Sequence, residues 1–163
     1  MPCDIVIIRE ASPADHDAVS RLYAQVDGLH SKSRPDAFQD PPEPGRSRAF
    51  LDEHLKADDA AMFVAEVEGV VVGFAFAKLG RPPDDPLHRP RLFAYLEDLV
   101  VSVECRRKGI GTALMSEVER WASRRKVDHV ELIVWEFNED ARRFYESLGY
   151  ATSYRRMFRI AGS

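Results

Sequence analysis

The sequence predicts a single-domain α/β protein with a mixed, mostly antiparallel sheet flanked by helices. Its 163 residues amount to about one domain, so we expect 1–163 to form a single domain. Two β-rich runs joined by a short turn predict an antiparallel hairpin in the first half. A strand–helix–strand unit over 92–135 predicts a right-handed parallel crossover in the second half.

The first 60 residues predict one strand and two helices. Residues 5–9 are a short apolar strand. Ser12 followed by Pro13 is a helix start, and apolar side chains at helical spacing carry that helix to about residue 27. Residues 46–56 form a second helix, whose inward side chains are Phe50, Leu51 and Leu55.

A hairpin and a long strand follow. Residues 61–67 and 70–79 are rich in β-branched and aromatic side chains and are joined by Glu68-Gly69. Residues 92–103 predict a central strand, because their second half is apolar on both faces. Proline clusters at 35–44 and 82–90 predict irregular loops, since proline breaks helices and sheet ladders.

The last third predicts two helices and two strands. Residues 109–125 have one apolar face and basic residues in the last turn, which is typical of a helix packed on a sheet. Residues 130–135 predict a strand, and 138–148 a short helix that ends at Gly149. Residues 153–160 predict a final strand.

Composition excludes several classes of protein. The net charge of −4 argues against a generally basic surface, so we expect neither nucleic-acid nor membrane binding. The two cysteines show no metal-site spacing and no apolar run approaches about 18 residues, so we expect no metal, no membrane span and a reduced, cytoplasmic setting. The first ten residues lack the basic start of a signal peptide.

Charge is divided unevenly along the chain. Residues 1–98 carry 11 basic and 18 acidic side chains, whereas residues 99–163 carry 12 basic and 9 acidic ones. This asymmetry favours an anionic partner for the second half, and chance scatter over a solvated surface is the alternative.

Residues 106–112 combine cations and glycines where a buried strand meets a helix. Two glycines let backbone approach a ligand closely, and the helix start presents amide groups with partial positive charge. An anion such as a pyrophosphate fits this loop. Leu114 stands where a Rossmann fingerprint needs its third glycine, and Lys108 precedes Gly109 rather than following it as in a P-loop. A basic helix start with a glycine turn remains the alternative.

Three motifs follow at characteristic distances: Arg106-x-x-Gly109-x-Gly111, Tyr-Leu-Glu-Asp-Leu-Val-Val at residues 95–101, and residues 138–150. They resemble, in that order, the pyrophosphate loop, the central strand and the C-terminal motif of the GNAT superfamily of N-acetyltransferases. The match covers residues 92–150 and is most similar to the diamine (spermidine/spermine) acetyltransferase branch. One departure is Val103, where many members carry proline.

The resemblance implies the acyl-CoA N-acyltransferase fold, with acetyl-CoA lying where the strands 97–102 and 130–135 splay apart. It implies that Asn138 contacts the pantetheine region and that Tyr145 protonates the leaving thiolate. Backbone amides would bind the thioester arm and the pyrophosphate. The implied cofactor-binding residues are Leu99, Val100, Val101, Arg106, Arg107, Lys108, Gly109, Ile110, Gly111, Thr112, Asn138 and Tyr145.

Each candidate has a second interpretation. Asn138 stands where an N-cap belongs, and Tyr145 lies beside apolar residues and could be core packing. Glu97 is a general base, a ligand for a cationic substrate, or the partner of an arginine. Strand alternation places Asp98 on the opposite face from Glu97, which makes Asp98 the weaker candidate.

The predicted function is therefore transfer of the acetyl group of acetyl-CoA to a primary amine of a small molecule by direct attack. The acidic first half favours a cationic acceptor. Cys105 is not assigned as a nucleophile, since no histidine stands beside it in sequence. A protein or ribosomal N-terminal acetyltransferase and a non-catalytic acyl-CoA-binding module are the alternatives.

Partners and acceptor walls are further expectations. Family members often form homodimers, so a homodimer is one option. The expected acceptor walls are the 80–91 loop together with His30, Arg34, Asp36 and Phe38.

Overall fold

The computed structural model describes residues 5–42 and 45–161 of the chain. The chain divides into two compact units, Met1–Ile133 and Val134–Ser163. Within the described residues, no helix is long and apolar enough to cross a lipid bilayer.

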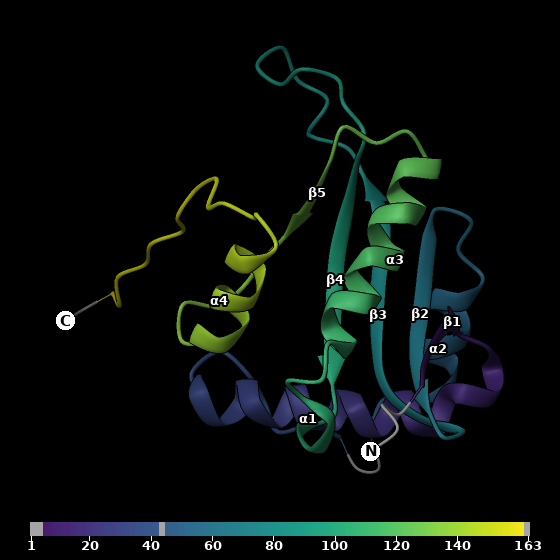
Figure 1. Cartoon of the computed structure of the whole chain (residues 1–163). Coiled ribbons are helices and arrows are strands. Elements are labelled where there is room, and N and C mark those ends of the chain that lie inside the picture. The colour runs from purple at the N-terminus through teal and green to yellow at the C-terminus, as the bar shows by residue number, and fades with distance from the viewer. Residues whose placement is uncertain (1–4, 43–44, 162–163) are drawn as a thin grey trace. The chain divides into compact units, whose positions relative to one another are not determined.

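The first unit is built on a five-stranded sheet (Figure 1) whose strands are paired in the order of the sequence. Neighbours from β1 to β4 pair antiparallel, and β4 pairs with β5 in parallel. The predicted mixed, mostly antiparallel sheet is confirmed. The strands are β1 (Val6–Glu10), β2 (Ala60–Val67), β3 (Val70–Gly80), β4 (Phe93–Val101) and β5 (His129–Leu132).

Helices cover both faces of this sheet. One face packs against α1 (His16–Ser33), which follows a 3-10 turn at Pro13–Asp15, and against α2 (Arg48–Leu55). The buried cluster on that face is Val19, Leu22, Tyr23, Leu51, Met62, Val64, Phe74, Phe76 and Val100. The opposite face is crossed by α3 (Ile110–Arg124), which lies in front of the sheet in Figure 1.

Helix α3 approaches the sheet closely at Gly73 of β3. A methyl group added there would come within 2.9 Å of the Val100 carbonyl oxygen and within 3.5 Å of side chains from Ile110 and Leu114. The apolar face predicted for residues 109–125 is therefore buried against the sheet. Leu114, Met115 and Val118 on this face are at most 1% exposed.

Helix α1 runs about six residues beyond its predicted end at residue 27. The apolar spacing runs out after Val26, but no proline interrupts the backbone until Pro35. Ser31 is buried on the added turn, and its hydroxyl donates to the Gly28 carbonyl at 3.3 Å. The Arg34 amide closes the helix on the His30 carbonyl at 2.8 Å.

Two predicted strands are shorter in the structure. β4 ends at Val101, and a 3-10 turn at Val103–Cys105 follows it, so the predicted strand end at 103 is wrong by two residues. β5 ends at Leu132 instead of 135. The other boundaries in the first unit agree with prediction to within two residues.

The second unit contains α4 (Glu139–Ser147). Asn138 caps its start, and Gly149 follows its end with φ of 91°, the left-handed conformation that glycine adopts at helix ends. The predicted final strand at 153–160 is wrong, because the structure forms no strand there. Apolar–polar alternation breaks at the pairs 155–156 and 157–158, and Met157 is 90% exposed, so no buried face favours a ladder.

Candidate active site

The edge of β4 is open over its second half. Parallel pairing with β5 covers only four residue pairs, from Phe93 opposite His129 to Leu96 opposite Leu132. Beyond Leu96, no strand among the described residues pairs with β4 on that side. Backbone donors and acceptors of Glu97–Val101 that face away from β3 can therefore bond to a ligand instead of a strand.

A bulge in β4 sets the direction of two carboxylates. Phe76 of β3 lies opposite Asp98 and Ala77 lies opposite Leu96, so Glu97 is the extra residue between them. Directly opposed residues of an antiparallel pair share a face. Asp98 therefore shares the face of Phe76, which is the face covered by α1 and α2.

Glu97 lies on that same face, and the predicted opposition of Glu97 and Asp98 is wrong. The carboxylate of Glu97 forms an ion pair with Lys78, which stands next after Ala77 on β3 and opposite Tyr95. Strict alternation fails because the bulge inserts one residue and resets the side-chain order. Glu97 thus has an ionic partner as one interpretation expected, but that partner is a lysine and not an arginine.

Asp98 is bound by a hydrogen bond from α1. The Tyr23 hydroxyl donates to Oδ2 of Asp98 at 2.8 Å, and the Arg46 guanidinium stacks 3.8 Å from the Tyr23 ring centre. Burial raises the pKa of the Asp98 carboxyl. The Tyr23 hydrogen bond and the Arg46 charge oppose this shift, and the neighbouring Glu97 charge adds to it. Arg46 is itself fixed by paired hydrogen bonds to Asp27 at 2.8 and 3.2 Å.

The loop between β4 and α3 has the backbone geometry of an anion site. Gly109 caps α3 with φ of 79°, and Arg107 also adopts a left-handed φ of 63°. The first backbone hydrogen bond of α3 is made by Ala113, whose amide donates to the Gly109 carbonyl at 3.0 Å. The amides of Ile110, Gly111 and Thr112 precede any intrahelical acceptor and carry the positive end of the helix dipole.

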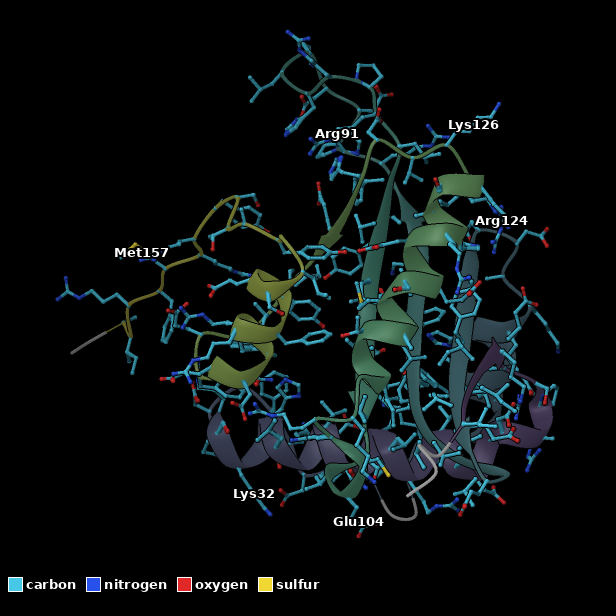
Figure 2. The ribbon with its side chains drawn as sticks, viewed as in Figure 1. Lys32, Arg91, Glu104, Arg124, Lys126 and Met157 are labelled. Atoms are coloured by element: carbon cyan, nitrogen blue, oxygen red, sulfur yellow. The ribbon has the colours of Figure 1, made fainter. Side chains whose placement is uncertain are left out.

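Side chains steady the same loop from both ends. The Arg106 Nε donates to the Val101 carbonyl at 3.2 Å, which turns this guanidinium back onto β4. The Val103 amide donates to Oε1 of Gln25 at 3.3 Å, a bond that a proline at this position could not make. Figure 2 labels Glu104 in this loop, and it labels Arg91 and Lys126 at the opposite end of the sheet.

The second unit carries the two other candidates. The Asn138 side-chain oxygen accepts a hydrogen bond from the Ala141 amide at 3.2 Å, so its interpretation as an N-cap is confirmed. Tyr145 is half-buried, and its ring makes edge contacts with Phe144 and Tyr150 at centroid distances of 5.3 and 5.8 Å. Both residues thus have structural roles within this unit.

The expected acceptor walls form local pairs in the first unit. Arg34 binds Asp36 with two hydrogen bonds of 2.6 and 2.7 Å, and the His30 and Phe38 rings lie 5.1 Å apart. The Arg34 guanidinium lowers the pKa of the Asp36 carboxyl. All four residues belong to the end of α1 or to the segment after it.

Sequence reasoning missed three residues that shape the site. Lys78, Tyr23 and Arg46 come from β3, α1 and the loop before α2, and only the fold brings them to β4. Lys78 can be recognised in the sequence as a site candidate, because it is a charged residue near the end of an otherwise apolar strand.

Comparison with protein families agrees with this geometry. Residues 24–150 match the model of the acetyltransferase (GNAT) family. Among curated relatives, an N-alpha-acetyltransferase of Sulfurisphaera tokodaii is 34% identical over 104 residues, 62% of each chain. A mycothiol acetyltransferase of Acidothermus cellulolyticus is 31% identical over 92% of this chain and 46% of its own length. The chain therefore spans less than two thirds of these relatives.

Solved structures agree in fold. A variant of the BH1408 protein of Bacillus halodurans superposes with a TM-score of 0.90 at 30% identity, covering 94% of this chain and 98% of its own. An aminoglycoside N-acetyltransferase in complex with CoA has a TM-score of 0.74 at 21% identity, covering 98% of this chain and 96% of its own, and shows the fold alone. Because the family model matches residues 24–150, the chain belongs to the acetyltransferase (GNAT) family.

Proposed function

We propose that this protein is an acetyl-CoA-dependent N-acetyltransferase that acetylates a primary amine of a small molecule by direct attack. The observation that carries the proposal is the open edge of β4 leading into the left-handed loop at Gly109. An edge of free backbone groups followed by a dipole-rich helix start suits a long thiol cofactor with a pyrophosphate.

Acetyl-CoA supplies the acetyl group as a thioester. On this proposal the amides of the Leu99–Val101 segment that face away from β3 bind the thioester arm and hydrogen-bond its carbonyl oxygen, and Arg106–Thr112 bind the pyrophosphate. One well-placed donor to a developing oxyanion contributes about 3 kcal/mol. The room beside Gly109 supports this fit, because a methyl group there would meet nothing within 4 Å.

Two side chains carry the proton transfers in this proposal. An amine with a pKa of about 10.4 is mostly protonated at neutral pH, so Glu97 accepts its proton directly or through water. Tyr145 donates a proton to the departing sulfur. The assignment of Asn138 and Tyr145 rests on the C-terminal family motif.

The acceptor class rests on charge and on relatives. Curated relatives include an aminoglycoside N(6')-acetyltransferase type 1 and an L-ornithine N5-acetyltransferase, which are named for small amines. The resemblance of residues 95–101 to the diamine branch supports the same class. The N-alpha-acetyltransferase of Sulfurisphaera tokodaii favours the second candidate, a peptide N-terminus.

A thiol-release assay tests the proposal. Acetyl-CoA is offered with primary amines or with short peptides, and binding of acetyl-CoA is measured separately by calorimetry. We expect amine-dependent release of CoA that falls on Glu97→Gln, with Glu53→Gln, an exposed residue of α2, as the matched control. Tight binding without release on any amine or peptide would contradict catalysis and favour an acyl-CoA-binding module.

A further inference from the structure

Lys78 and Glu97 form a charged pair at the border between core and solvent. Phe76, two residues before Lys78 on the same face of β3, is 3% exposed and contacts the His54 ring of α2 at 4.6 Å. The side chains of Lys78 and Glu97 are 46% and 27% exposed. The pair therefore stands where helical cover of this face gives way to solvent.

The pair is placed by backbone register. Lys78 lies directly opposite Tyr95, and its ammonium nitrogen is 6.0 Å from the Tyr95 ring centre. Glu97 is the bulged residue two positions further along β4, beside the open strand edge. Register and bulge together bring one cation and one anion to the strand segment where the proposed thioester arm would lie.

This arrangement changes which acceptor the site accommodates. An acceptor that carries only an amine must displace Lys78 to reach Glu97, and it leaves two like charges near one carboxylate. Like charges in contact are unfavourable, especially where side chains are partly desolvated. Asp98 does not relieve this repulsion, because it is held by Tyr23 and burial raises its pKa.

An acceptor that carries both an amine and a carboxylate meets no such conflict. Its amine binds Glu97 while its carboxylate binds Lys78, so one internal ion pair is exchanged for two intermolecular ones. Complementary charges of this kind provide specificity more than raw affinity. We propose that Lys78 is a specificity-determining residue and that the pair selects a zwitterionic acceptor, an amino acid, over the corresponding diamine. This inference rests on the proposed function.

Matched acceptors that differ by one carboxylate test the proposal. The assay compares kcat/KM for L-ornithine against putrescine and for L-lysine against cadaverine. Wild type is expected to prefer each amino acid by at least about ten-fold, which corresponds to one ion pair of roughly 1.4 kcal/mol.

Substitutions at Lys78 separate recognition from structure. Lys78→Met is expected to remove the preference through KM, with kcat for the diamines kept or raised, whereas Lys78→Arg is expected to retain it. Lys56→Met, at an exposed position after α2, is the control and should leave kcat/KM for all four acceptors unchanged. Thermal melts of the variants check that the fold is kept.

The outcomes distinguish the two proposals. Turnover of diamines and amino acids at equal efficiency, unchanged in Lys78→Met, would overturn the role of Lys78 and leave amine acetylation standing. A preference for diamines in wild type would overturn it as well. Absence of turnover with all four acceptors, despite acetyl-CoA binding, would overturn the selection of amino acids and count against the proposed small-amine acceptor.

Discussion

The hydroxyl of Tyr23 donates a hydrogen bond of 2.8 Å to Oδ2 of Asp98, which joins α1 to β4 one residue after the Glu97 bulge. Tyr23 is 1% exposed, and burial raises the pKa of its hydroxyl, so this group remains a donor at neutral pH. The bond therefore fastens the strand segment that carries both carboxylates.

Removal of this donor should destabilise the fold. Tyr23→Phe leaves the Asp98 carboxylate buried without its hydroxyl partner, which costs about 1–3 kcal/mol. Urea denaturation at pH 7 measures the change in free energy of unfolding. Tyr154→Phe, at a position 71% exposed, is the control and should stay within about 0.5 kcal/mol of wild type. Equal stability of both variants would show that the hydrogen bond contributes nothing.

The raised pKa of Asp98 predicts a pH dependence of stability. Between the ordinary aspartate pKa and the raised folded value, the native state binds more protons than the unfolded state. The contribution of Asp98 is therefore greatest at low pH and is lost as pH rises through the folded pKa. Asp98→Asn keeps an oxygen that accepts the hydrogen bond from Tyr23, and it should remove this loss of stability with rising pH.

Denaturation curves between pH 4 and 7 measure that effect. The stability of wild type relative to Asp98→Asn should fall with rising pH, by at most about 1.4 kcal/mol per pH unit. Asp58→Asn, an exposed position, should give a flat difference. A difference that rises with pH would mean that Asp98 is stabilised as the anion.

Substitution by alanine should change the free energy of unfolding in opposite directions at two glycines that have no close neighbours. Gly109 has φ of 79°, so Gly109→Ala is expected to cost about 1–2 kcal/mol through backbone strain and to weaken acetyl-CoA binding several-fold. Gly28 lies inside α1, and Gly28→Ala should stabilise by about 0.5–1 kcal/mol and leave binding unchanged. Calorimetry with acetyl-CoA would contradict the loop's role if both variants bound equally well.

Substitutions at Asn138 separate capping from cofactor contact. Asn138→Ala removes the cap oxygen and should cost about 0.5–2 kcal/mol of stability. Asn138→Asp keeps the cap and lacks the amide donor, so stability should be retained while acetyl-CoA affinity falls. Unchanged affinity in Asn138→Asp would leave this residue with the cap alone.

Tyr145 should be needed for rate and not for binding. Tyr145→Phe keeps the ring contacts with Phe144 and Tyr150 and removes the hydroxyl group that donates the proton. The value of kcat should therefore fall by on the order of 10²–10⁴, while acetyl-CoA affinity is retained. Tyr150→Phe, which removes a hydroxyl from the neighbouring ring, is the matched control. A wild-type rate in Tyr145→Phe would remove its acid role.

Local sequence signals predicted much of the fold. The hairpin at Glu68-Gly69, the cap at Asn138 and the amphipathic face of α3 depend on neighbours within a few residues, so periodicity and turn chemistry suffice to find them. The loop at Gly109 was found for the same reason, because its glycines and cations are consecutive.

Long-range pairing decided the rest. Alternation along β4 alone put Glu97 and Asp98 on opposite faces, and only the register against β3 shows the bulge that brings them to one face. By itself the sequence determined the kinds of element and the anion loop, since those follow from local backbone preference. Only the tertiary structure decided that Lys78 pairs with Glu97 and Tyr23 with Asp98, because strand register and helix packing bring together residues 19 to 75 positions apart.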